Sequence, residues 1–503
     1  MPQWMESQKH TLLLVYVLYF ISHVFFITLP PKGTHVWRQS NTSAVTRNFV
    51  EEDMNILKPR VDRRRNTDGV TGMQFPSFEF SAALLCWING GYFEASNRIV
   101  AFLFFAFSIF YFYRWAYILT KSRLKSFWST YMYTWCPILF YHAISALPDV
   151  LALTASVAAL YHFFKHDQLR RPKDIAWLLF WLTLAGLTKL QYLMVGIPMA
   201  AITLQRFLAK DYKQSTFLKI AAVGISSLGI SIAWYVHAAN LITSTGLDDF
   251  GIKINPETNI TNALLIIKEN LLEIFPELIF GYAGVLGFLY FLFKNNSIRR
   301  PFSHSILPFT VWFFGMLAYH FIELVQMREH VYYMFPYLPL LLLAAGLGIY
   351  QLTKVHKFWL YFFLVLLPIS AFGRVFHHWT GEKNNATAVF YHVDREKLVS
   401  VIPKGALTIV GPDETGCVFH YFTETKGFTF ASQNDLIQTD NTSKRFDTYV
   451  AEGAQFFILG NGEMPNPQIL PFLGKPIFTF ETLTIYPIIL PNALTVGQIP
   501  FKH

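Results

Sequence analysis

Residues 98–119 read RIVAFLFFAFSIFYFYRWAYIL, and this stretch sets the class of the protein. A helix that crosses a bilayer needs about 17 to 25 predominantly apolar residues, and this stretch has that length. Arg98 and Arg114 are its charged residues, and both lie near its ends. The stretch is therefore predicted to be a transmembrane helix.

Stretches of the same kind recur along the first three quarters of the chain. The predicted spans are 11–29, 98–119, 126–143, 148–164, 175–189, 191–207, 218–237, 276–293, 305–322, 331–352 and 358–373. The first span resembles a signal peptide. Its apolar core is too long for one, however, and Pro30-Pro31-Lys32 is a poor cleavage site, so we expect a retained helix.

The composition supports a membrane protein. Of the 503 residues, 53% are hydrophobic and 15% are charged, whereas soluble domains are about 25% charged. This composition excludes an ordinary soluble enzyme, a disordered chain and a repeat scaffold. The three cysteines lack metal-ligand spacing, so no metal site and no disulfide framework are predicted. No cofactor is predicted either, and no residue pattern indicates a divalent cation.

The basic residues predict the orientation in the membrane. If the N-terminus is cytoplasmic, most Lys and Arg residues of the short loops face the cytoplasm, whereas the later outer loops hold few, among them Lys189 and Arg328. This asymmetry follows the positive-inside rule. The net charge of +9 is then a topology signal, and no nucleic-acid partner is predicted.

That orientation puts two long segments outside the cytoplasm. In the loop 30–96, the apolar stretch 75–91 is too short to span and ends at Gly90-Gly91, so it predicts an interfacial helix. The tail 375–503 alternates short apolar runs with polar stretches, which predicts a small α/β domain. We therefore expect an α-helical polytopic membrane domain over 1–374, with about 11 transmembrane helices, and an extracytoplasmic domain over 375–503.

Ionisable groups beside the outer membrane surface are the candidate site residues, because such groups are costly there. Trp37-Arg38-Gln39 lies in the first loop, and a guanidinium pairs well with phosphate. The alternative for this loop is attraction to anionic lipid head groups. Asp149 opens a span, where a helix N-terminus alone also favours it. Lys189 lies in a tight outer connection, where simple snorkelling is the alternative.

The fourth candidate cluster precedes a late span and contains Arg328, His330, Tyr332 and Tyr333. The two tyrosines alone are typical of an interfacial aromatic belt. Together with Asp149 and the other outer clusters, they predict one cavity that opens outward and toward lipid.

The order of these features resembles the GT-C class of membrane glycosyltransferases, particularly the bacterial branch related to protein O-mannosyltransferases and the lipid A aminoarabinose transferase. The resemblance covers about residues 10 to 375. It rests on the long first outer loop with interfacial helices, on Pro148-Asp149 and on Gly-Leu-Thr-Lys at 186–189. The charged and aromatic entry to a late span and the extracytoplasmic tail also match. The stretch from His35 to Phe80 also resembles a subgroup pattern in which His-x-Trp-Arg-Gln is followed by Pro-Arg-Val-Asp and Phe-Pro.

The resemblance implies transfer of a sugar from a polyprenyl-phosphate carrier to a glycan, lipid or protein acceptor at the outer face. An acidic residue would act as general base, and basic groups would stabilise the departing phosphate. Members commonly carry an acidic pair where this chain has Trp37-Arg38-Gln39. The expected base is therefore Asp62, followed by His35, while Asp149 matches the family's second acidic position. Relatives also have Lys or an acidic residue where this chain has Gln74.

Other function classes stay open at this point. A polysaccharide polymerase or ligase would use a lipid-linked oligosaccharide, and a lipid-linked sugar flippase or transporter would move its substrate unchanged. A transporter typically has internal repeats and helices broken at mid-membrane, and neither pattern is found in the sequence. An inactive homologue is a further alternative. The resemblance implies a location in a bacterial inner (plasma) membrane, with membrane lipids as partners.

Overall fold

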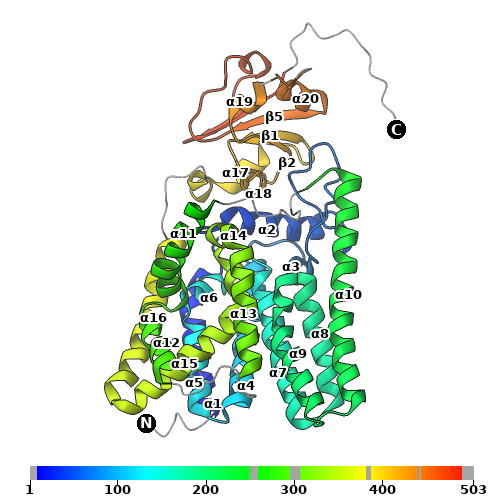
Figure 1. The fold of residues 1–503 in the computed structure, drawn as a ribbon. Helices are drawn as coiled ribbons and strands as arrows, with labels where there is room; N and C mark the ends of the chain where they lie inside the picture. Colours follow the sequence, from blue (N-terminus) through cyan, green and yellow to red (C-terminus); the bar gives the residue numbers. More distant parts are fainter. Residues whose placement is uncertain are drawn as a thin grey trace.

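The computed structural model describes residues 8–248, 250, 259–294, 306–380, 387–437, 439–440 and 443–489. A bundle of long helices carries a sheet-containing module at one end, and helix α1 (Gln8–His23) lies toward the opposite end (Figure 1). The first outer loop lies between the bundle and this module.

Every predicted span coincides with a helix or with a pair of consecutive helices. The helices of the bundle are α1 (Gln8–His23), α4 (Ser96–Thr120), α5 (Arg123–Thr134), α6 (Pro137–His142), α7 (Asp149–Leu169), α8 (Pro172–Thr188), α9 (Gly196–Leu208), α10 (Gln214–Thr245), α11 (Ile260–Glu269), α12 (Ala283–Lys294), α13 (Leu307–Ile322), α15 (Leu338–Val355) and α16 (Lys357–Thr380). Short 3-10 segments connect some of them, such as η3 (Leu190–Val195) and η5 (Val331–Tyr337).

By length and composition, the described helices include fewer complete spans than the sequence predicts. Within the described residues, four helices are long and apolar enough to cross a membrane, counting η5 and α15 as one. A fifth span arises if α11 and the following helical segment η4 (Asn270–Ile279) are joined with α12 across a bend of 110°. The chain is thus a mostly helical membrane protein, and the count of eleven spans stays a prediction.

Small residues allow the helices at the centre of the bundle to approach closely. A Cβ at Gly346 of α15 would collide with the backbone of Ser129 on α5, and one at Gly348 would collide with the carbonyl of Gly287 on α12. Helix association in membranes depends on such close packing, because lipid removes the hydrophobic driving force between helices. These contacts hold α5, α12 and α15 together.

The first outer loop forms two helices. The predicted helix at 75–91 is confirmed as α3 (Ser77–Ile88). The resemblance implies more than one helix in this loop, but the residue pattern did not place the second one, α2 (Val36–Glu51), whose residues from Arg38 to Phe49 are all buried. A polar helix is buried in this way only when it is covered on both sides, and α2 lies between the bundle and the C-terminal module (Figure 1).

The predicted C-terminal α/β fold is confirmed. The sheet has the strand order β2-β1-β5-β7-β6, with β1 (Leu407–Gly411) parallel to both β2 (Lys426–Thr429) and β5 (Ala454–Leu459). Strands β6 (Phe478–Phe480) and β7 (Leu483–Pro487) are antiparallel. The remaining elements are the helices α17 (Arg395–Ser400), α18 (Val418–Thr423), α19 (Gln433–Ile437) and α20 (Arg445–Ala451) and the strand pair β3 (Thr439–Asp440) and β4 (Ser443–Lys444).

Replacing Gly346 with Leu tests the helix contact directly. We expect Gly346→Leu to lower the unfolding temperature in detergent, because overpacking a close contact costs about 1–3 kcal/mol. Gly224→Leu on α10 is the matched control, since a Cβ at Gly224 meets nothing within 4 Å. Equal unfolding temperatures for the two variants would contradict the close approach of α5 and α15.

Candidate active site

A buried ion pair lies where α7 begins and α8 ends. Asp149 is the first residue of α7 and is fully buried. Lys189 Nζ donates to both carboxylate oxygens of Asp149 at 2.9 Å, and the Tyr192 hydroxyl donates to Asp149 Oδ1 at 3.1 Å. A charge buried this deeply needs a partner and hydrogen bonds, and Asp149 has both.

Two tyrosines cover the ammonium of this pair. Lys189 Nζ lies 4.6 Å from the ring centre of Tyr332 and 4.9 Å from that of Tyr333, which is the range of cation–π contacts. The structure thus brings together four of the residues that the sequence singled out.

Histidine and tryptophan side chains extend this group toward α2. The His35 ring packs edge-on against Tyr332 at 4.9 Å and lies 5.8 Å from the His330 ring. The Trp37 ring lies 5.7 Å from the His330 ring. His35 has a φ of 58° directly before α2, a left-handed conformation that is uncommon outside glycine and that often marks functional sites.

Arg38 and Glu79 bring further charge to the same place. Arg38 on α2 is 4% exposed, and Glu79 in the first turn of α3 is fully buried. Arg38, Glu79 and Asp149 all act electrostatically on Lys189, so the four charges lie close together. We call Arg38, Glu79, Asp149, Lys189, His35, His330, Tyr332 and Tyr333 the outer polar cluster.

Several buried polar atoms of the outer polar cluster have no hydrogen-bond partner among the described residues. They are Arg38 Nη1, Glu79 Oε2, His35 Nε2 and His330 Nδ1. Buried polar groups in proteins are nearly always paired, so each exception needs a reason. The atoms without partners belong to two histidine rings, a guanidinium and a carboxylate. Such a set of unpaired groups is expected where a polar ligand binds.

Two predicted residues, Gln39 and Arg328, have other contacts. Gln39 Nε2 donates to the carbonyls of Lys32 and Thr34 at 3.0 Å, so Gln39 supports the backbone of the loop. Arg328 is 45% exposed and forms an ion pair with Glu269 at 3.0 Å. The contacts of Arg328 therefore point to the surface rather than to the outer polar cluster.

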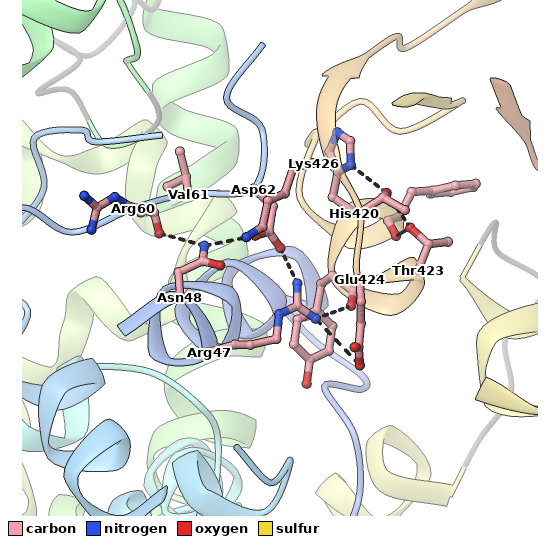
Figure 2. A network of polar contacts seen from close by, with 12 residues as sticks. Arg47, Asn48, Arg60, Val61, Asp62, His420, Thr423, Glu424 and Lys426 are labelled. Atoms are coloured by element: carbon pink, nitrogen blue, oxygen red, sulfur yellow. Dashed lines mark hydrogen bonds and ion pairs between the residues drawn. The ribbon is translucent and has the colours of Figure 1, made fainter. Parts of the chain in front are cut away.

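The predicted base Asp62 lies at the junction between the first loop and the C-terminal module (Figure 2). Arg47 Nη2 donates to Asp62 Oδ2 at 2.6 Å, and Asn48 Nδ2 donates to Asp62 Oδ1 at 2.9 Å. Arg47 also donates to the carbonyl of Tyr421 at 3.1 Å. Both oxygens of Asp62 are therefore engaged in a structural contact, and we revise the expectation that it accepts a proton.

The residue that the sequence reading missed is Glu79. It is the single charged residue within the apolar stretch 75–91, and a lone acidic group beside a membrane is itself a signal of function. The apolar pattern of the stretch predicts the helix but gives no role to this acidic side chain.

Comparisons with known proteins give a clear result for the fold alone. No protein-family model matches the sequence, and no curated protein matches it. Among solved structures, ArnT from Cupriavidus metallidurans bound to undecaprenyl phosphate has a TM-score of 0.60 at 9% identity, over 97% of this chain and 98% of that one. The chain has the GT-C fold.

Other structures with the GT-C fold agree. The Archaeoglobus fulgidus oligosaccharyltransferase tethered with an acceptor peptide has a TM-score of 0.58 at 9% identity, over 91% of this chain and 70% of that one. The mycobacterial arabinofuranosyltransferase AftD has a TM-score of 0.53 at 13% identity, over 95% of this chain and 42% of that one.

A double-mutant cycle tests the buried pair of this GT-C fold. We expect Lys189→Met to destabilise the protein strongly, because removing one partner of a buried ion pair costs about 3–5 kcal/mol. Asp149→Asn combined with Lys189→Met should cost less than the two single changes added together. Additive losses of unfolding temperature would contradict a direct interaction between the two side chains.

Proposed function

We propose that the chain is an integral membrane glycosyltransferase that moves a sugar from a polyprenyl-phosphate carrier to an acceptor on the extracytoplasmic face. The observation that carries the proposal is the buried Arg38, whose Nη1 has no hydrogen-bond partner among the described residues and whose charge acts on Lys189 in a chain with the GT-C fold. Asp149 already pairs with Lys189, so the open donor of the buried Arg38 guanidinium is the group that needs a further acceptor, such as an anion.

The anion that suits Arg38 and Lys189 is the lipid phosphate of the donor. Arg38 offers a planar fork of donors, and Lys189 offers a point charge. An ammonium has three N–H donors, so the two bonds to Asp149 leave one for a ligand. Negative charge grows on the phosphate as the bond to the sugar breaks, and cations fixed at that place lower the barrier.

The aromatic and histidine side chains suit the sugar. Trp37 and Tyr332 offer flat apolar faces, and His35 offers ring nitrogens that pair with hydroxyl groups. Burial lowers the pKa of His35 to about 3, with further lowering from His330, Lys189 and His378. His35 is therefore neutral at physiological pH, with one donor and one acceptor nitrogen. That low basicity makes His35 a poor proton acceptor, so we propose that it binds rather than catalyses.

The carrier class is supported by the structural neighbours. ArnT is bound to undecaprenyl phosphate, and the archaeal oligosaccharyltransferase AglB is in complex with a dolichol-phosphate and an inhibitory peptide. A carrier of this kind reaches the site laterally through the membrane, so the membrane lipids are the medium of the reaction. The acceptor would approach from the side of the C-terminal module.

The charge pattern supports an orientation, and the resemblance to the bacterial branch of the GT-C class supports a location. We propose a multi-pass protein of a bacterial inner membrane with a cytoplasmic N-terminus, a membrane domain over 1–374 and an extracytoplasmic domain over 375–503. The N-terminal end of α1 and the C-terminal sheet lie at opposite ends of the bundle (Figure 1), which fits this topology. The outer polar cluster would then lie on the extracytoplasmic side.

A second candidate is an oligosaccharide transferase, which includes the polymerase or ligase considered above. The similarity to an oligosaccharyltransferase supports it. This enzyme would use the same cations on the same lipid phosphate and would differ in the length of the sugar chain. A transfer assay that compares donors carrying one sugar with donors carrying several distinguishes the two candidates.

Sugar transfer in nanodiscs tests the proposal. Purified protein is given radiolabelled polyprenyl-phosphate sugars, and sugar released from the carrier is measured. We expect Arg38→Ala to lower the rate about 100-fold or more, because losing one donor to developing charge costs that much. Arg328→Ala is the matched control and should stay near the wild-type rate, since Arg328 is 45% exposed and pairs with Glu269.

Equal rates for wild type and Arg38→Ala would remove Arg38 from the proposed site. Release of no sugar from any donor by the wild type would overturn the transferase.

A further inference from the structure

Glu79 is a buried carboxylate with an open oxygen. Its Oε1 accepts a hydrogen bond from Gln74 Nε2 at 3.2 Å, whereas Oε2 has no partner among the described residues. A carboxylate in the first turn of α3 gains from the helix N-terminus even when it is exposed. Complete burial of a carboxylate with an unpaired oxygen costs free energy. The favourable interaction with the helix N-terminus alone does not explain why this cost is tolerated.

Glu79 is held at its backbone and at one carboxylate oxygen. The Thr46 hydroxyl on α2 donates to the backbone carbonyl of Glu79 at 3.3 Å, and Gln74 holds Oε1 from the preceding segment. Gln74 occupies the position where relatives have Lys or an acidic residue. In this chain the amide of Gln74 acts on the acidic group of Glu79, and it leaves Oε2 free.

The other two acidic groups considered for the reaction are occupied. Both oxygens of Asp149 accept from Lys189, and one of them also accepts from Tyr192. Both oxygens of Asp62 accept from side chains of α2. Among these three carboxylates, Glu79 has the oxygen that is free to accept a proton.

The charges around Glu79 give it an unusual acidity. Burial raises the pKa of Glu79 to about 7. The Arg38 guanidinium, the backbone N–H of Glu79 itself and the Gln74 hydrogen bond oppose that rise, and the Asp149 carboxylate adds to it. The Lys189 ammonium also interacts with Glu79. A group with a pKa near the operating pH both takes up and releases protons efficiently.

We propose that Glu79 is the general base that takes the proton of the acceptor hydroxyl, and this inference rests on the transferase function proposed above. The acceptor O–H bond breaks and its proton goes to Glu79 Oε2. The oxygen then forms a bond to C1 of the sugar, while the bond from C1 to the phosphate oxygen breaks. The electron pair of that bond leaves with the polyprenyl phosphate, beside Arg38 and Lys189, and Glu79 later releases its proton to water.

The rate of sugar transfer as a function of pH tests this role. We expect the wild-type rate to rise with pH through about 7 and then to level off, because Glu79 must be ionised to accept a proton. Glu79→Gln should lower kcat about 100-fold or more and should remove that step from the pH profile. Glu79→Asp should retain part of the rate, and Asp62→Asn, provided that it folds, should keep the pH profile of the wild type.

Two further measurements distinguish failure of the proposed base from failure of the proposed transferase. Thermal unfolding shows whether Glu79→Gln is folded, and binding of labelled polyprenyl phosphate should be unchanged in that variant. Wild-type transfer together with a near-normal rate and pH profile for Glu79→Gln would overturn the base and leave the transferase standing. A wild type that transfers from no donor would overturn both.

Discussion

The ion pair between Asp149 and Lys189 is the constraint on which the outer end of the bundle depends. Two charges removed from water are tolerated only when their geometry and remaining hydrogen bonds are good, and here the ammonium meets both carboxylate oxygens while Tyr192 supplies a further bond. The pair fixes the start of α7 against the end of α8. The tyrosines of η5 then pack over the ammonium, and the rings of the first loop pack against those tyrosines. The positions of the tyrosines and of the first-loop rings in the outer polar cluster therefore depend on this pair.

The C-terminal module completes the enclosure from the other side. Polar side chains of α2 are buried because the module covers them, and Arg47 connects the two parts through Asp62 and the carbonyl of Tyr421 (Figure 2). Burial of α2 also removes Arg38 from water. The module thereby contributes to the electrostatics of the cluster without supplying any of its members, since a cation in a medium of low dielectric constant attracts an anion more strongly than it does in water.

The features that depend on local sequence pattern could be predicted. Apolar length predicted the helices, alternation predicted the C-terminal sheet, and position beside the outer surface predicted that Asp149, Lys189, His330 and Tyr332 meet. Prediction failed where a partner lies far away in the chain. Asp62 looked free because the burial of its partner Arg47 depends on a contact with Tyr421, 374 residues further on. The pairing of Arg328 with Glu269 depends on how α11 packs. Glu79 is the one charged residue in a stretch whose apolar pattern predicts a helix, and that pattern does not show that its side chain is buried.

The central claim is that the outer polar cluster binds a lipid phosphate. A cryo-electron microscopy structure of the protein in nanodiscs with polyprenyl phosphate tests it most directly. The account predicts phosphate density within hydrogen-bond distance of Arg38 Nη1 and Lys189 Nζ, with the lipid chain leaving toward the membrane. Phosphate density elsewhere, for example beside Arg328, with the cluster unchanged and empty, would contradict it.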